Sequence, residues 1–121
     1  MKALAFLSAL VVALLHVGFM VLEMVFWTEP FGQEVFGTTP AFAAESATLA
    51  FNQGLYNGFL AAGLLWGLLA GKRDVVVFFL LCVIVAGIVG GLTASMGIIA
   101  VQAAPGVIAL LLQILAPKRA S

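Results

Sequence analysis

The sequence predicts an all-α membrane protein in which four helices cross the bilayer as one bundle. Three observations predict this class: 64% of the 121 residues are hydrophobic, only 8% are charged, and the mean hydropathy is +1.26. An average soluble domain carries about 25% charged residues, so this chain has too few to cover a water-facing surface. The composition therefore excludes a soluble globular enzyme and a disordered chain.

Charge and cysteine content exclude further classes. Five Lys and Arg residues balance five Asp and Glu residues, and no basic run is present, so nucleic acid is not an expected partner. Cys82 is the single cysteine, which excludes an internal disulfide and a cysteine-rich metal site. No cofactor and no metal are expected, and the expected partners are membrane lipids.

The first predicted helix covers residues 3–27, which is long enough to span a bilayer. Helix breakers follow it, among them Pro30 and Pro40, and predict a loop over residues 28–44. The loop carries apolar side chains such as Phe31 and Phe36, so it is expected to lie on the membrane interface.

Three more helices are predicted at residues 45–71, 75–92 and 96–116, within a single domain of residues 1–121. A short charged turn separates the second and third helices, and a turn of small residues separates the third and fourth. The last helix ends at Pro117, which cannot continue a helical ladder.

The basic residues indicate the orientation of these helices. With four spans, Lys2, the Lys72–Arg73 turn and the Lys118–Arg119 tail all fall on one side of the membrane. The positive-inside rule places that side in the cytoplasm, so both termini are expected there.

Polar side chains inside a membrane are costly, so their positions point to candidate functional residues. On the first helix, His16 and Glu23 are seven residues apart and share one face. The second and fourth helices supply the rest of the set: Asn52, Gln53, Tyr56, Asn57 and Gln102.

The expected depths of these residues agree. At 1.5 Å per residue, Glu23 lies about 6 Å and His16 about 16 Å inside Trp27, and from a helix start at Glu45 Asn52 lies about 10 Å and Asn57 about 18 Å in. Gln102 lies about 9 Å below the start of the fourth helix. If the three helices face one another, these side chains form one polar pocket in the outer half of the bundle.

Each polar residue also has a structural interpretation. The amide side chains can join helices by hydrogen bonds, and His16 can be a neutral histidine bonded to a carbonyl oxygen. Glu23 can reach outward to the interface. Glycines spaced by four residues indicate close helix packing within the bundle, and the alternative is a homo-oligomer formed through the face of Gly87 and Gly91.

The string Asn52-Gln53-Gly54-Leu55-Tyr56-Asn57-Gly58, preceded by His16, Glu23 and Trp27, resembles a family of small bacterial membrane proteins catalogued as domain of unknown function 1304. The resemblance covers nearly the whole chain. It implies a four-helix protein of the bacterial inner membrane, and it implies no activity. In size and layout the chain is also loosely similar to small multidrug exporters, although its orientation bias differs from theirs.

Two classes of function remain open, beside a structural role as a membrane subunit. The favoured hypothesis is a binding or transport protein whose pocket takes a small polar or amphipathic ligand, with Glu23 and His16 exchanging protons. The alternative is an intramembrane enzyme that uses the same two residues as acid and base on a lipid-like substrate. About 10 Å separates them along the helix, so they would flank the substrate without sharing a proton.

Overall fold

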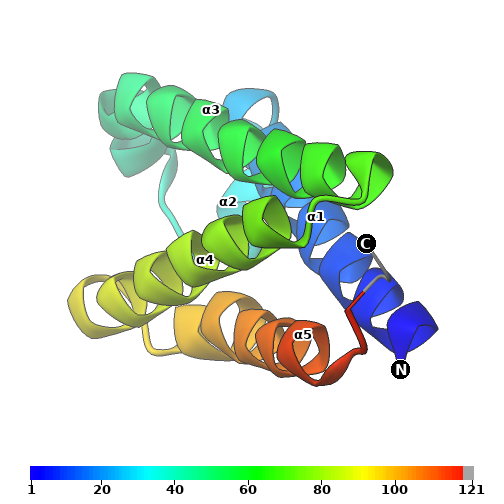
Figure 1. Ribbon diagram of the computed structural model, residues 1–121. Helices are drawn as coiled ribbons and strands as arrows, with labels where there is room; N and C mark the ends of the chain where they lie inside the picture. The colour runs from blue at the N-terminus through cyan, green and yellow to red at the C-terminus, as the bar shows by residue number, and fades with distance from the viewer. Residues whose placement is uncertain (119–121) are drawn as a thin grey trace.

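The computed structural model describes residues 1–118, and all regular secondary structure in that range is helical (Figure 1). The elements are α1 (Lys2–Met24), α2 (Pro30–Phe36), α3 (Pro40–Ala70), α4 (Arg73–Thr93), the π-helical turn η1 (Ile99–Ala103) and α5 (Ala104–Leu115). Within the described residues, α1 and α4 are long and apolar enough to cross a membrane. The all-helical class is confirmed, with five α-helices instead of four.

The largest difference from the predicted boundaries lies in residues 28–44, which are not a simple loop. The helix predicted over residues 45–71 is α3, and it begins at Pro40 because Thr39 caps it. The Thr39 Oγ1 accepts a hydrogen bond of 3.1 Å from the Phe42 backbone nitrogen. Proline suits a first helical turn, since its missing N–H has no intrahelical partner there. The short α2 occupies most of the remaining segment and ends at Gly37, whose φ of +66° is left-handed.

The other boundaries shift by smaller amounts. The first helix ends at Met24, three residues before the predicted end, and the helix predicted over 75–92 runs from Arg73 to Thr93. The predicted helix 96–116 consists of η1 and α5 together, over Ile99–Leu115.

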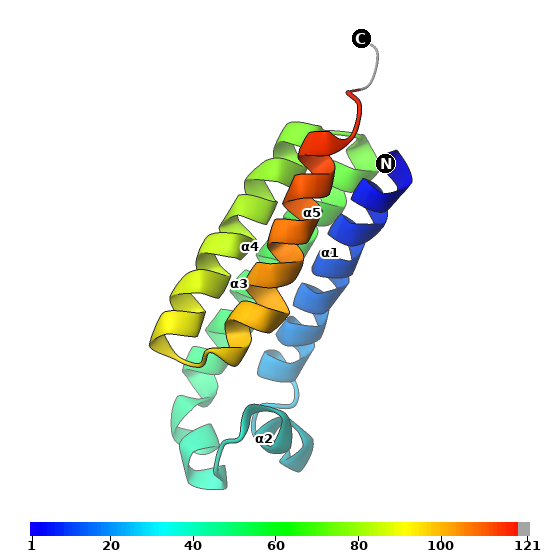
Figure 2. The same cartoon turned by 90° about the horizontal axis from the view of Figure 1, so that it is seen from below.

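The long helices run alongside one another, and α1 packs against both α3 and α5. On the other side, α4 packs against α3, α5 and η1. Figure 2 shows that the N-terminus, the α3–α4 turn and the end of α5 lie together, whereas α2 and the start of α3 project beyond the opposite end. We call the first of these the basic end, because Lys2, Lys72, Arg73 and Lys118 lie there.

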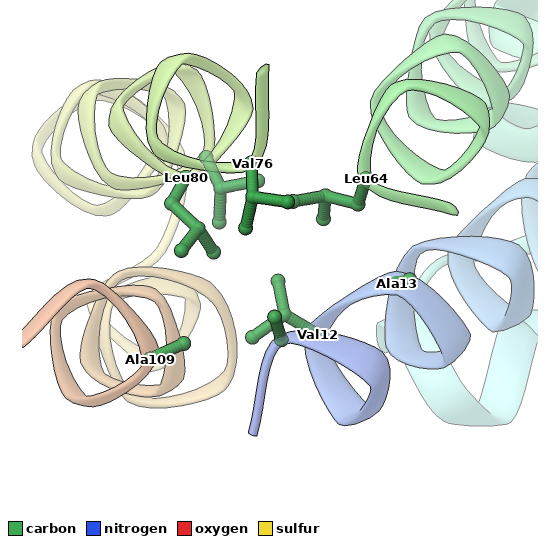
Figure 3. Close-up of a cluster of buried hydrophobic side chains, with 8 residues drawn as sticks. Val12, Ala13, Leu64, Val76, Leu80 and Ala109 are labelled. Carbon is green, nitrogen blue, oxygen red and sulfur yellow. The ribbon is translucent and has the colours of Figure 1, made fainter. Parts of the chain in front are cut away.

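Small side chains fill the interior. Most of the buried hydrophobic residues are alanines, which lie on α1, α3, η1 and α5. The larger members of the central cluster are Val12, Leu64, Val76, Leu80 and Val83 (Figure 3). Large apolar side chains point outward instead; Leu69 is 82% exposed and Leu92 is 72% exposed. Small interior residues let helix backbones approach closely, which is the packing found in membrane proteins.

The glycines of α4 are used for packing within the chain. A Cβ on Gly87 would lie 2.6 Å from the backbone nitrogen of Ala103 in η1, and one on Gly91 would meet the side chain of Ile99. The face expected to join two copies of the chain is therefore covered by η1.

Replacing Gly87 with alanine is expected to destabilise the fold by about 1–3 kcal/mol, because the new methyl group overpacks against Ala103. The matched control is Gly18→Ala on α1, where nothing lies within 4 Å of the added atom. That variant is expected to gain about 0.5–1 kcal/mol, since alanine restricts the unfolded backbone more than glycine does. Thermal unfolding of both variants in mild detergent, followed by circular dichroism, measures the difference. Equal shifts in Tm would contradict the close packing of α4 on η1.

Candidate functional site

Close packing of α1 against α3 brings Glu23 and Asn57 together. Asn57 lies on the buried face of α3, three residues after Gly54. A Cβ on Gly54 would lie 3.1 Å from the backbone oxygen of Met20, so glycine is needed for this approach of the two helices. Asn57 Nδ2 donates a hydrogen bond to Glu23 Oε1. The carboxyl group thus has an amide partner on the neighbouring helix.

His16 lies two turns further along α1, toward the basic end, and is fully buried. Its Nδ1 lies 2.8 Å from the Val12 carbonyl oxygen, and its Nε2 lies 3.0 Å from Gln102 Nε2. A carbonyl oxygen can only accept and an amide nitrogen can only donate, so Nδ1 carries the proton and Nε2 accepts. His16 is therefore a neutral imidazole with both ring nitrogens bonded.

Gln102 reaches His16 from η1, the π-helical turn before Pro105. The Ala104 N–H bonds to the Ile99 carbonyl oxygen, five residues back. Pro105 has no N–H to donate, and the helix becomes α-helical again from Ala104 onward. Single π turns inside α-helices occur frequently at functional positions. Here the π turn carries Gln102, so η1 contributes to the polar contacts beside α1 and α3.

Three of the predicted pocket residues lie elsewhere. Asn52, Gln53 and Tyr56 are exposed on α3, and Tyr56 is 57% exposed. The buried stripe of α3 runs through Ala50, Gly54, Asn57 and Ala61, and these three residues are not on it. The structure therefore groups four of the seven predicted residues into two pairs: Glu23 with Asn57, and His16 with Gln102.

The earlier start of α3 also changes the expected depths. Since Asn57 pairs with Glu23, the two lie at one level, and Asn57 is not 12 Å deeper as the depths of about 6 Å and 18 Å implied. Asn52 lies five residues toward α2, or about 7 Å beyond the level of Glu23 and so past the end of α1 at Met24.

Contacts of Trp27 hold the end of α2 near the start of α3. Trp27 Nε1 donates a hydrogen bond of 3.1 Å to Ser46 Oγ on α3. The Trp27 ring also lies 5.0 Å from the ring of Phe36 at the end of α2. Ser46 lies about 16 Å along α3 from Asn57, so these contacts lie beyond the level of the Glu23–Asn57 pair.

Within residues 1–118, no group of three or more His, Cys, Asp or Glu side chains lies together in a way that could hold a metal ion. The described residues do form a cavity that sequence reasoning missed, at the basic end between α1, α3, α4 and α5. Gln113 lies at its wall and donates a hydrogen bond of 3.0 Å to the Ala5 carbonyl oxygen. The grouping of basic residues at one end was the available indication of this cavity.

Comparison with known proteins gives one match. Residues 10–114 match the family model described as "Protein of unknown function (DUF1304)". No curated protein and no solved structure matches the chain. The match covers both polar pairs.

Replacing Gln102 with leucine is expected to lower the free energy of unfolding by about 1–3 kcal/mol, because Nε2 of the buried His16 loses its donor. The same replacement at Gln53 provides the control. Gln53 is exposed and has no hydrogen bond in the described structure, so Gln53→Leu is expected to change stability by less than about 0.5 kcal/mol. Thermal unfolding in one detergent compares the two variants, and equal losses would contradict a structural role for the His16–Gln102 pair.

Proposed function

Since the chain belongs to DUF1304, a family of proteins of unknown function, we propose a function from its geometry. The protein is a four-helix transmembrane bundle of the bacterial inner membrane. It binds a small cationic amphipathic ligand at Glu23, from the outer side, in exchange for a proton. The observation that carries this proposal is a carboxyl group at a helix interface with only a neutral amide as partner.

The side-chain distribution supports insertion in a bilayer. Large apolar side chains are exposed around the outside of α1, α3, α4 and α5, and in water such a surface would drive aggregation. The interior is rich in alanine and glycine around a small cluster of valine and leucine side chains. Lipid around the bundle would cover the outer side chains, since lipid tails are as apolar as leucine.

The charge distribution supports the orientation. Lys2, Lys72, Arg73 and Lys118 lie at the basic end, and Glu29 and Glu34 lie at or in α2, near the opposite end. A cytoplasmic basic end follows the positive-inside rule. Glu23 then lies in the outer half of the membrane, below α2.

The isolation of Glu23 from positive charge supports cation binding. The described basic residues are all at the basic end, and no ion pair to Glu23 occurs within residues 1–118. A carboxylate in hydrocarbon is costly unless a positive charge compensates it. Either its own proton or a bound cation can therefore balance this group, and exchange between the two couples ligand binding to proton release.

The acid–base enzyme alternative has less support. His16 is completely buried, and both of its ring nitrogens are bonded within the protein. A substrate would have to break those hydrogen bonds before it reached either nitrogen. We therefore assign His16 and Gln102 to holding η1 against α1, and we assign ligand exchange to Glu23 with Asn57.

The proposal predicts that the purified protein binds a lipophilic cation and releases a proton. Tetraphenylphosphonium added to protein in weakly buffered mild detergent is expected to release about one proton for each cation bound. Glu23→Gln keeps the shape but removes the charge, and should weaken binding by roughly tenfold or more and abolish proton release. Calorimetry and a pH-sensitive dye measure the two quantities.

The control is Glu34→Gln, which removes a carboxylate from the exposed face of α2. It is expected to leave cation affinity and proton release unchanged. Equal losses in both variants would indicate nonspecific attraction to negative charge. No binding by the wild type, or binding unaffected by Glu23→Gln, would favour a structural role for the Glu23–Asn57 pair.

A further inference from the structure

A second candidate site lies at the basic end, away from Glu23. The ends of four helices line an open cavity of about 600 Å³ there. Three basic side chains from separate parts of the chain line it: Lys2 at the start of α1, Arg73 at the start of α4, and Lys118 after α5. Folding thus brings together cations that are far apart in the sequence.

The cavity carries an excess of positive charge. Asp74 is its single acidic lining residue, and Asp74 Oδ1 accepts a hydrogen bond of 3.0 Å from the Val75 backbone nitrogen. Arg73 Nη1 donates to the Ala116 carbonyl oxygen at 3.0 Å, which fixes the guanidinium at the cavity wall. That bond uses one of five N–H donors, so the group can also bind an anion.

The rest of the lining is apolar. Phe6, Leu68, Val77 and Pro117 are among the residues that form the walls. Inorganic phosphate could bind the basic side chains but would leave the apolar walls uncovered. An anionic amphiphile would contact both, because it carries an anion and hydrocarbon in one molecule. Basic pockets between helices at the cytoplasmic surface are suited to anionic lipid headgroups.

We propose that this cavity binds the phosphate group of an anionic phospholipid from the cytoplasmic leaflet. Lys2, Arg73 and Lys118 contact the phosphate, and the apolar walls cover the adjoining hydrocarbon. The proposal uses the membrane orientation proposed above, but it does not depend on cation exchange at Glu23.

Native mass spectrometry of the full chain in mild detergent tests the assignment in three separate titrations. The probes are phosphatidylglycerol, phosphatidylcholine with the same acyl chains, and inorganic phosphate. We expect one molecule of phosphatidylglycerol to be retained at least fivefold more tightly than phosphatidylcholine. Equal retention of the two lipids would overturn the proposal, and so would displacement of phosphatidylglycerol by equimolar inorganic phosphate.

Charge-neutralising variants then locate the lipid. Lys2→Gln and Lys118→Gln are each expected to weaken phosphatidylglycerol binding roughly fivefold. Both leave the Arg73–Ala116 hydrogen bond in place, so the helix ends should stay together. Lys72→Gln is the matched control at the same end, because the Lys72 ammonium lies 5.3 Å from the Trp66 ring centre and does not line the cavity.

We expect Lys72→Gln to change lipid affinity by less than twofold. If Lys72→Gln lost as much lipid affinity as Lys2→Gln, the proposed site would be overturned, because binding would then depend on net charge alone. Glu23→Gln should retain the lipid unchanged, which separates failure of this proposal from failure of cation exchange. A Tm within a few degrees of wild type, measured without lipid, shows that each variant is folded.

Discussion

The absence of side chains at Gly54 and Gly58 sets how closely α1 and α3 approach. Both positions face Met20, and a Cβ at either would press on it. The approach lets Asn57 reach Glu23 across the helix interface. The same face of α1 carries His16 two turns further on, where it meets Gln102. The separation of α1 from its neighbours therefore decides whether the polar groups bond to one another or remain unpaired.

The two polar pairs are chemically different although both join α1 to a neighbour. His16 and Gln102 satisfy each other, because the Gln102 amide donates one hydrogen bond and Nε2 of the neutral imidazole accepts it. Such a pair holds η1 in place without needing any further group. Asn57 gives Glu23 a hydrogen bond but no positive charge, so the pair is complete only with a proton or a cation. This difference separates a packing contact from the proposed exchange site.

The sequence was sufficient to predict the all-helical class and the approximate positions of the breaks before Arg73 and after Thr93. It was not sufficient to predict which face of α3 is buried, because Asn52, Gln53, Tyr56 and Asn57 spread over an arc of about 140° around the helix. They therefore cannot all lie on one narrow buried stripe. The small residues at 50, 54 and 61 define the buried stripe, and Asn57 is the one polar member of the four on it. The cap at Thr39 was missed because Pro40 is both a helix breaker and a good first residue. The basic cavity depends on side chains that meet only in the folded chain.

The unequal lengths of α4 and α5 have a consequence for biosynthesis. Together η1 and α5 form a 17-residue apolar stretch, Ile99–Leu115, which at 1.5 Å per residue reaches about 25 Å, short of the roughly 30 Å hydrocarbon core. The preceding α4 has 21 residues and is strongly apolar, and Gly87 brings it against Ala103. In the transmembrane arrangement proposed above, α4 would carry its shorter partner across the bilayer as one helical hairpin. Because Gln102 lies in this last part of the chain, the hydrogen bond to His16 could form only after α4 had been translated.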